Sequence, residues 1–483
     1  MWFLETPFIL AVILIIGILL YLLRTPLVAG IQLTQHLIRS SWYWTPLTWL
    51  YFALLLTYAC RFPLSYDEAY TFKNFTSKSL FSVLCTYPQP NNHVFHSLLT
   101  WVSWKLFHWF PGPLAVRLPA IMASVLSFQL VQHFFLKRSA QYGQILLALM
   151  VITTNYFQFS FQARGYALHA FFALISYCLI QSKQANFNAR YIGFMFFSFL
   201  ALYTNPAYLF TAVTLGVYWL LTEIKTFQLE FRNVVLITIT FALLTLLAYF
   251  PIMRHEGIDA LIGNDFVQPL EHLTMRDLIR FTNKLGLFGF LPYPFAFITP
   301  LLFILFSLKQ KHYARFSFVV VPFIMMYLMN QLPEFKRIFL PLTALMTFMT
   351  LEAITQWDAL PQIKNRLISI IQPAILLIII GLGLYYFEHD HKKYDFNTAF
   401  RLKRINQHVE HANKVYFSNL YWHLKIPVEA QRKYNRNEWI FKREIPNQLN
   451  EKEFLLSSLS LPQFHCIDTF PLHKGMAYLY IGK

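Results

Sequence analysis

The stretch Tyr66-Asp67-Glu68-Ala69 lies just beyond an apolar segment that ends near Cys60, and Pro90-Asn91-Asn92-His93 follows it along the chain. Charged residues make up only 13% of the sequence, whereas hydrophobic residues make up 56%. Adjacent carboxylates at a membrane boundary are costly and therefore indicate a function. An acidic site over a large apolar bundle suggests chemistry on a substrate that is itself anchored in lipid.

The composition is typical of a polytopic helical membrane protein. The mean hydropathy is +0.43, and the 483 residues include 50 Phe, 27 Tyr and 11 Trp. The formal net charge of +17 comes from Lys and Arg residues that lie mostly in short loops between apolar runs. Cations in such loops orient helices and meet anionic headgroups, so we expect membrane lipid, and no nucleic acid, as a partner. The four cysteines have no spacing typical of disulfides or metal knuckles.

The apolar runs predict an all-α bundle of about twelve transmembrane helices. They lie at roughly 7–23, 44–60, 114–135, 143–160, 166–182, 190–204, 206–221, 233–252, 287–307, 316–331, 338–355 and 367–387. The segment Val94 to Phe110 is apolar enough to span, but it carries His96, Lys105 and His108. If this segment lies flat, the basic loops all fall on the cytoplasmic side, as the positive-inside tendency requires. We therefore expect an interfacial helix in the first outer loop.

The composition changes abruptly after Phe387. Helical periodicity at Phe396 to Asn413 and strand-like patterns at Lys414 to Ser418, Glu438 to Lys442 and Ala477 to Ile481 predict a small α/β domain. The chain is thus expected to have a transmembrane domain at 1–387 and a small domain at 388–483. Helix parity places this second domain and the acidic loop outside the cytoplasm.

Asp67 and Glu68 are candidate catalytic residues. Neighbours on a helix diverge by about 100°, so we expect only one of them to be the reactive carboxylate. Such a group can act as a general base, bind a divalent ion, form a buried ion pair, or simply cap a helix. Asn91, Asn92 and His93 add amide and imidazole groups that could bind a sugar, a metal or a phosphate. Asp67 and His93 are the candidates for a divalent metal ion, although His93 lacks a second ligand at metal spacing.

Basic residues near the ends of the predicted spans are the second set of candidates. Arg117 begins a span, Arg164 lies in a very short connection, and Lys336-Arg337 precedes another span. The topology puts all of them at the outer face, where a phosphate leaving group would need cations. They could instead merely extend to lipid headgroups. Lys336 and Arg337 favour binding, because basic residues on the outer side oppose the positive-inside tendency.

Five motifs together resemble the GT-C glycosyltransferases. In chain order they are Ser65-Tyr-Asp-Glu-Ala-Tyr-Thr-Phe72, Pro90-Asn-Asn-His93, Ala115-Val-Arg-Leu-Pro119, Ala163-Arg-Gly-Tyr-Ala-Leu168 and Arg337-Ile-Phe-Leu-Pro341. The chain is similar to the branch that contains the protein O-mannosyltransferases and the bacterial transferases that put aminoarabinose on lipid A. The resemblance covers approximately residues 44–355.

The resemblance implies an enzyme that transfers a hexosyl or pentosyl group from a polyprenyl-phosphate donor, with inversion, to a lipid, polysaccharide or protein acceptor. It also implies a multi-pass protein of the bacterial inner membrane, active on the extracytoplasmic side. Asp67 would match the family's essential first-loop aspartate, with Glu68 beside it. The implied substrate-binding residues are Asn91, Asn92, His93, Arg117, Arg164, Tyr166, Lys336 and Arg337.

The sequence departs from the family pattern at two points. Asn91-Asn92-His93 stands where relatives often carry a His-Pro-Pro or Pro-Pro motif, which leaves the role of His93 open. Many relatives have a second acid in a later outer loop, and here Glu256, Asp259 or Asp265 takes that part, or no second acid is used.

A transporter or flippase for a lipid-linked anion is the competing class. It would also need basic residues near helix ends, but it should place its main polar groups near the bilayer midplane on broken helices. In this sequence those groups fall in predicted outer loops. A membrane scaffold leaves the acidic loop unexplained, whereas a polymerase or ligase for lipid-linked glycans stays open.

Cysteine labelling tests the predicted topology. In a background without the four native cysteines, Ser77→Cys and Ser457→Cys should both react with an impermeant thiol reagent from outside the cell. Gln310→Cys should not react, because its basic loop is expected in the cytoplasm. Opposite labelling of Ser77→Cys and Ser457→Cys would contradict the topology.

Overall fold

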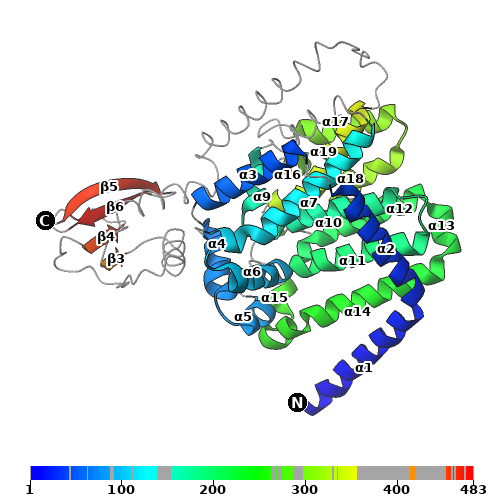
Figure 1. Ribbon diagram of the computed structural model, residues 1–483, viewed down its shortest axis with the longest axis horizontal. Coiled ribbons are helices and arrows are strands. Elements are labelled where there is room, and N and C mark those ends of the chain that lie inside the picture. The colour runs from blue at the N-terminus through cyan, green and yellow to red at the C-terminus, as the bar shows by residue number, and fades with distance from the viewer. Residues whose placement is uncertain are drawn as a thin grey trace, which may run out of the picture.

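The architecture is taken from a computed structural model of the chain (Figure 1). It describes residues 2–42, 45–62, 64–87, 92–110, 113–138, 154–262, 267–269, 275–286, 297–328, 331–333, 336–355, 414–418, 453–457, 461, 464–472 and 475–481. These residues form a helical bundle with a small sheet at one end of the molecule (Figure 1).

Helices and short turns account for the bundle. The first half contains α1 (Trp2–Leu22), α2 (Arg24–Ser41), α3 (Pro46–Arg61), α4 (Tyr66–Thr71), the π-helix η1 (Phe72–Thr76), α5 (Leu80–Cys85), α6 (Val94–Phe107), α7 (Leu114–Arg138), α9 (Thr154–Phe161), α10 (Tyr166–Gln181), α11 (Phe187–Thr204) and η2 (Pro206–Tyr208). The second half contains α12 (Leu209–Thr222), α13 (Ile224–Leu229), α14 (Phe231–Glu256), α15 (Asp259–Ile262), α16 (Met275–Gly286), α17 (Ile298–Lys309), η4 (Tyr313–Phe316), α18 (Ser317–Leu328), η5 (Lys336–Phe339) and α19 (Leu340–Thr355).

Helix α10 forms the centre of the bundle. Every residue from Tyr166 to Ile180 is buried, and α7, α11 and α19 pack around the helix. A helix that is apolar on all sides is the kind that a large bundle or a membrane protein buries completely. Because α10 begins directly after Gly165, the short connection 162–165 lies at one end of this central helix.

The region between α3 and α7 contains the helices predicted for the first outer loop. Helix α6 (Val94–Phe107) confirms the helix expected at Val94 to Phe110 and packs on α5 and α7. Its interfacial position stays a prediction. Two segments later in the chain pair as a short sheet. In this sheet β1 (Val267–Pro269) is antiparallel to β2 (Gln331–Pro333).

The number of membrane spans stays a prediction. Among the described residues, Leu114–His133 and Phe231–Glu256 are long and apolar enough to cross a membrane, and two bent helix pairs raise the number to at most four. Several other apolar helices have 10–17 residues. The predicted span 367–387 and the first part of 143–160 lie outside the described residues.

Helix α2 was not expected from the sequence. It bends away from α1 by 74° and packs on α11. The approach is close at Gly30, where an added Cβ would lie 3.0 Å from the carbonyl oxygen of Ala189. Polar residues lower the hydropathy of α2 below that expected of a membrane span. The sequence pattern therefore did not predict this helix, and it is recognised from its packing in the structure.

The C-terminal residues form a sheet of four strands, in the order β3-β4-β6-β5. The strands are β3 (Lys414–Ser418), β4 (Glu453–Ser457), β5 (His465–Leu472) and β6 (Gly475–Ile481). Strands β3 and β4 are parallel, and the other pairs are antiparallel. The predicted strands at Lys414 to Ser418 and Ala477 to Ile481 are confirmed. The expected helix at Phe396 to Asn413, the expected strand at Glu438 to Lys442 and the domain boundary near 388 lie outside the described residues.

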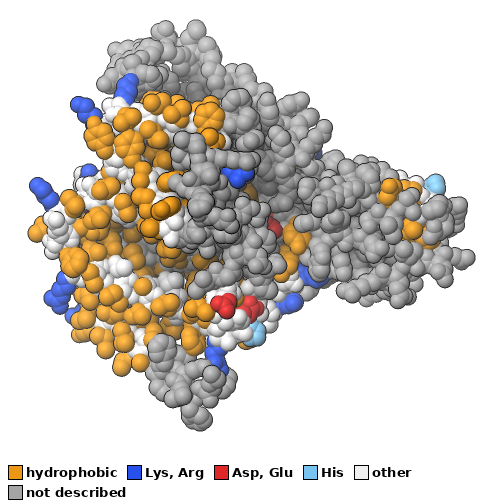
Figure 2. Space-filling model, turned by 180° about the vertical axis from the view of Figure 1, so that it is seen from behind, with side chains coloured by type: hydrophobic (Ala, Val, Ile, Leu, Met, Phe, Trp, Pro, Cys, Tyr) orange, Lys and Arg blue, Asp and Glu red, His pale blue; other side chains and the backbone are white. Residues whose placement is uncertain are grey.

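The surface of the helical part is strongly apolar. Figure 2 shows hydrophobic side chains over most of the described face, with Lys and Arg gathered toward its edge. Leu14 on α1 and Leu246 on α14 are 65% and 57% exposed. A contiguous apolar surface of this kind indicates contact with membrane or with another protein. The apolar composition of the chain favours contact with membrane.

Candidate active site

Helix α4 carries both carboxylates, and the local sequence explains where it starts. Ser65 precedes the helix and Glu68 occupies its third position, which is the pattern of a capping box. The Ser65 backbone N–H donates to Glu68 Oε2 over 2.8 Å. This hydrogen bond turns the Glu68 side chain back toward the start of the helix.

Glu68 forms a buried ion pair with Arg117 of α7. Arg117 Nε donates to Glu68 Oε1 over 2.8 Å, and Nη2 donates to Oε2 over 2.7 Å. The Ala163 backbone N–H adds a bond of 2.7 Å to Oε1. Arg117 Nη1 also donates to the carbonyl oxygens of Ala59 and Phe62, over 2.8 and 2.6 Å. This pair therefore ties the end of α3, the start of α4, α7 and the 162–165 connection to one point.

Both members of the pair are almost completely buried, with 1% of each residue exposed. Burial alone would raise the pKa of Glu68, but the Arg117 guanidinium and the backbone hydrogen bonds hold this pKa below its ordinary value of 4.5. Glu68 is thus an ionised carboxylate whose two oxygens are both engaged. Neither Glu68 nor Arg117 presents its charge to a substrate.

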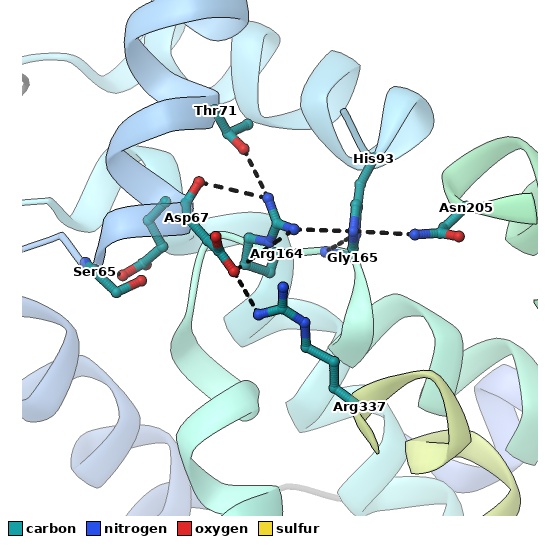
Figure 3. A network of polar contacts seen from close by, with 9 residues as sticks. Ser65, Asp67, Thr71, His93, Arg164, Gly165, Asn205 and Arg337 are labelled. Carbon is teal, nitrogen blue, oxygen red and sulfur yellow. Dashed lines mark hydrogen bonds and ion pairs between the residues drawn. The ribbon is translucent and has the colours of Figure 1, made fainter. Parts of the chain in front are cut away.

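Asp67 lies beside two arginines instead. Its Oδ2 accepts a hydrogen bond from Arg337 Nη1 and is 4.0 Å from Arg164 Nη2, as Figure 3 shows. The Asp67 and Arg337 side chains are 14% and 17% exposed. A carboxylate and a guanidinium with part of their surface open can both reach a bound molecule.

Arg164 is fixed by several partners. Its Nη1 donates to the hydroxyl of Thr71 over 3.0 Å and points to the backbone oxygen of Asp67 at 3.5 Å. Its Nη2 is 3.2 Å from Nε2 of His93. The guanidinium carbons of Arg164 and Arg337 lie 6.0 and 5.5 Å from the centre of the Tyr166 ring, a distance at which cation–π attraction operates. The structure therefore brings Asp67, Arg164, Tyr166 and Arg337 together, and their roles in binding and catalysis stay predictions.

His93 is buried behind Arg164. Its Nδ1 accepts from the Gly165 backbone N–H over 2.9 Å, and its Nε2 is 3.2 Å from Nδ2 of Asn205. Burial, followed by the charge of Arg164, holds the pKa of His93 well below its ordinary value of 6.5. The ring is therefore neutral. Asn205 was not among the predicted residues, although its position before Pro206 is typical of a residue that caps a turn.

The other candidates have different positions. Asn92 is buried and donates to the carbonyl oxygens of Val83 and Thr86, over 2.9 and 2.8 Å, so it holds the loop. Asn91 and the side chain of Lys336 lie outside the described residues.

Of the three candidates for a second acid, Glu256 accepts the Tyr87 backbone N–H over 2.7 Å, and Asp259 begins α15. Asp265 is not among the described residues.

The suggested metal ligands do not fit a metal ion. Asp67 faces two guanidinium groups, and both ring nitrogens of His93 face N–H groups. Within the described part of the chain, no three His, Cys, Asp or Glu side chains gather as metal ligands would. We therefore derive no chemical step through a metal.

The sequence matches no protein-family profile and no curated protein. Among solved structures, ArnT from Cupriavidus metallidurans in the apo state matches with a TM-score of 0.54. The match covers 89% of this chain and 97% of that chain, at 11% identity. The chain has the ArnT fold.

A structure of the same ArnT bound to undecaprenyl phosphate matches equally well, with a TM-score of 0.54, 11% identity, and coverage of 89% of this chain and 96% of that chain. The ArnT-like fold agrees with the helical architecture that the motifs implied. At this identity the likeness establishes the fold alone.

Replacing Glu68 tests the buried pair. Glu68→Gln should lower the free energy of unfolding by about 3–5 kcal/mol, because it leaves the Arg117 charge buried without an anion. Asp67→Asn is the matched control at the neighbouring carboxylate and should cost about 1 kcal/mol or less, since that pair is partly exposed. Thermal unfolding of the purified variants measures both. Equal losses of unfolding free energy in the two variants would contradict the assignment of Glu68 to a buried pair and of Asp67 to a partly exposed one.

The pH dependence of stability follows from the same pair. The pKa of Glu68 is lower in the folded protein than in the unfolded chain. Its contribution is therefore complete above the ordinary carboxyl pKa and is lost as the pH falls through the lowered folded value. Glu68→Gln should remove this part of the acid sensitivity, which unfolding midpoints recorded between neutral and acidic pH would reveal.

Proposed function

We propose that the protein is an integral membrane glycosyltransferase that moves a sugar from a polyprenyl-phosphate donor to an extracytoplasmic acceptor. One observation carries this proposal: the partly open Asp67 carboxylate lies against Arg337 and Arg164 at one end of the central helix. A potential base and two cations at one point are what transfer from a phosphate leaving group requires.

The donor class rests on the cations and on the fold. Arg164 and Arg337 can each hold a phosphate through paired N–H groups. The ArnT structure with bound undecaprenyl phosphate supports a polyprenyl phosphate as the ligand of this fold. The broad apolar surface suits a substrate whose chain remains in lipid.

In the proposed reaction, an acceptor hydroxyl attacks the anomeric carbon from the face opposite the phosphate. The new bond forms between the hydroxyl oxygen and this carbon while the bond from the carbon to the phosphate oxygen breaks, which inverts the anomeric configuration. Asp67 takes the hydroxyl proton, and Arg164 and Arg337 stabilise the negative charge that develops on the departing polyprenyl phosphate. The products are the glycosylated acceptor and polyprenyl phosphate.

The arrangement couples donor binding to the base. Asp67 accepts a hydrogen bond from Arg337, which is one of the two groups that the phosphate needs. A phosphate that binds to Arg337 displaces the Asp67 carboxylate from it. Asp67 then becomes available to the acceptor hydroxyl only when the donor is in place.

Glu68 and Arg117 have a supporting role in this proposal. Their carboxylate and guanidinium neutralise each other within the core, and their hydrogen bonds set the direction of α4. The sequence placed Glu68 among the catalytic residues and Arg117 among the binding residues. The geometry favours assigning both to the frame that positions Asp67.

The same proposal makes the protein a multi-pass protein of the bacterial inner membrane, with the site and residues 388–483 on the extracytoplasmic side. The acceptor can be a lipid, a polysaccharide or a protein, and the donor can carry a hexosyl or a pentosyl group. A transporter for a lipid-linked anion is the alternative. It would move labelled lipid across a bilayer without splitting the sugar from the phosphate.

The direct assay uses the purified protein and a panel of labelled polyprenyl-phosphate sugars, with bacterial envelope lipids, glycans and proteins as acceptors. Release of polyprenyl phosphate together with a glycosylated acceptor supports a transferase. A chelator is included in parallel, since loss of activity there would support a divalent ion. Flipping of intact donor in proteoliposomes, without release, would support the transporter.

Asp67→Asn separates binding from chemistry. Turnover should fall by about two to four orders of magnitude, because the side chain keeps its size and loses its basicity. Binding of polyprenyl phosphate should become tighter by roughly fivefold, since the carboxylate that competes for Arg337 is gone and a partly exposed ion pair is worth about 1 kcal/mol. Weaker binding in Asp67→Asn would contradict the competition, and normal turnover would contradict the role as base.

Arg337 variants test the phosphate contact. Arg337→Ala should weaken donor use while the protein remains folded, and Arg337→Lys should recover only part of it because paired N–H contact is lost. The KM for the donor, measured beside the thermal unfolding midpoint, distinguishes the two effects. Unchanged donor kinetics in both variants would leave Arg337 as a residue that only extends to lipid headgroups.

A further inference from the structure

We infer that His93 and Asn205 are positioning residues that hold Arg164 in place for the donor phosphate. This inference rests on the proposed function. It starts from a row of contacts that runs from the α11–η2 junction through the buried imidazole to the Arg164 guanidinium (Figure 3). None of the motifs in the sequence assigns a partner to His93.

The first link fixes the backbone next to Arg164. The Gly165 N–H donates to Nδ1 of His93 over 2.9 Å. A Cβ added at Gly165 would lie 2.6 Å from the same Nδ1 and 2.4 Å from Cγ2 of Thr204. The connection between α9 and α10 is therefore packed directly on the imidazole, which explains why glycine follows Arg164.

The second link reaches the guanidinium itself, and it is a hydrogen bond only in the tautomer whose Nε2 accepts. Nε2 of His93 is 3.2 Å from Nη2 of Arg164 and 3.2 Å from Nδ2 of Asn205. Asn205 Oδ1 accepts the Ala207 N–H over 2.9 Å, which turns the amide nitrogen toward the imidazole. Asn205 thus holds the ring from the side opposite Arg164.

The chemistry of imidazole makes this arrangement specific. A neutral ring has one accepting nitrogen, so Nδ1 and Nε2 cannot both accept at once. In one tautomer the ring accepts from Gly165, and in the other it accepts on the side of Arg164. In the first case the ring holds Arg164 through the backbone of the next residue, Gly165, and in the second it accepts from the guanidinium directly, whereas a protonated ring could accept from neither. The lowered pKa of His93 keeps the ring in the neutral form that can do so.

The consequence concerns the donor. Arg164 reaches Asp67 and Thr71 from a connection of only four residues, 162–165. Without the imidazole, its guanidinium would lose the contact that fixes it from behind. Loss of one charge-assisted hydrogen bond to a phosphate weakens binding by roughly ten- to a hundredfold. Because Arg164 is proposed to contact the phosphate, the loss should raise the KM for the donor more than it lowers turnover with saturating donor.

The test is a double-mutant cycle between His93 and Arg164. His93→Leu should raise the donor KM by roughly ten- to a hundredfold, and Asn205→Ala should have a smaller effect in the same direction. In an Arg164→Ala background, His93→Leu should change the KM by less than twofold, because its effect passes through Arg164. An equal fold-change in both backgrounds would overturn the inference.

Conservative variants separate positioning from simple packing. His93→Asn places an acceptor near the Nδ1 position, and His93→Gln places one near the Nε2 position. One of the two should recover a large part of the donor KM that His93→Leu loses, and which one does so identifies the accepting nitrogen. Thermal unfolding of each variant establishes that it is folded. Folded Asn and Gln variants that both behave like His93→Leu would contradict the hydrogen-bonding role.

His96→Leu is the control for the loss of a fully buried imidazole, since His96 lies one turn further along and its Nδ1 is 3.4 Å from the Thr100 hydroxyl. Its effect should depend on Arg164 far less than the effect of His93→Leu does. A wild-type protein that neither binds polyprenyl phosphate nor releases it would contradict the proposed function itself. A working wild type, impaired Arg164→Ala and an additive cycle would contradict only the positioning role.

Discussion

The buried ion pair between Glu68 and Arg117 is the contact on which the geometry of the site depends. It joins the end of α3, the start of α4 and the long helix α7, and through Ala163 it reaches the connection that carries Arg164. An ion pair without solvent is stable only when its remaining hydrogen-bonding groups are satisfied. Here both carboxylate oxygens accept two hydrogen bonds each, so the pair can serve as a rigid support.

This support gives two neighbouring carboxylates different roles. With Glu68 turned into the core by the cap of α4, Asp67 must point toward the other side, where Arg164 and Arg337 lie. The two arginines come from connections 173 residues apart in the sequence, and both lie near the Tyr166 ring. A substrate phosphate and Asp67 would compete for the same guanidinium, which links donor binding to the release of the base.

The sequence predicted the parts of the site that carry charge, because charges are rare in an apolar chain and each requires a reason. It therefore identified Asp67, Arg164 and Arg337, and the order of the motifs indicated the fold. The sequence did not reveal that Arg117 forms an ion pair with Glu68, because the two residues are 49 positions apart and no local pattern joins them. Asn205 was missed for the same reason: its position before Pro206 indicates only a residue that caps a turn, and only the fold shows that it faces His93.

A structure of the protein with bound polyprenyl phosphate would show whether the donor displaces Asp67. We expect the phosphate to lie within hydrogen-bonding distance of Arg164 and Arg337, Asp67 to have left Arg337, and Glu68 still to pair with Arg117. A phosphate bound elsewhere, with Asp67 unmoved on Arg337, would contradict this expectation.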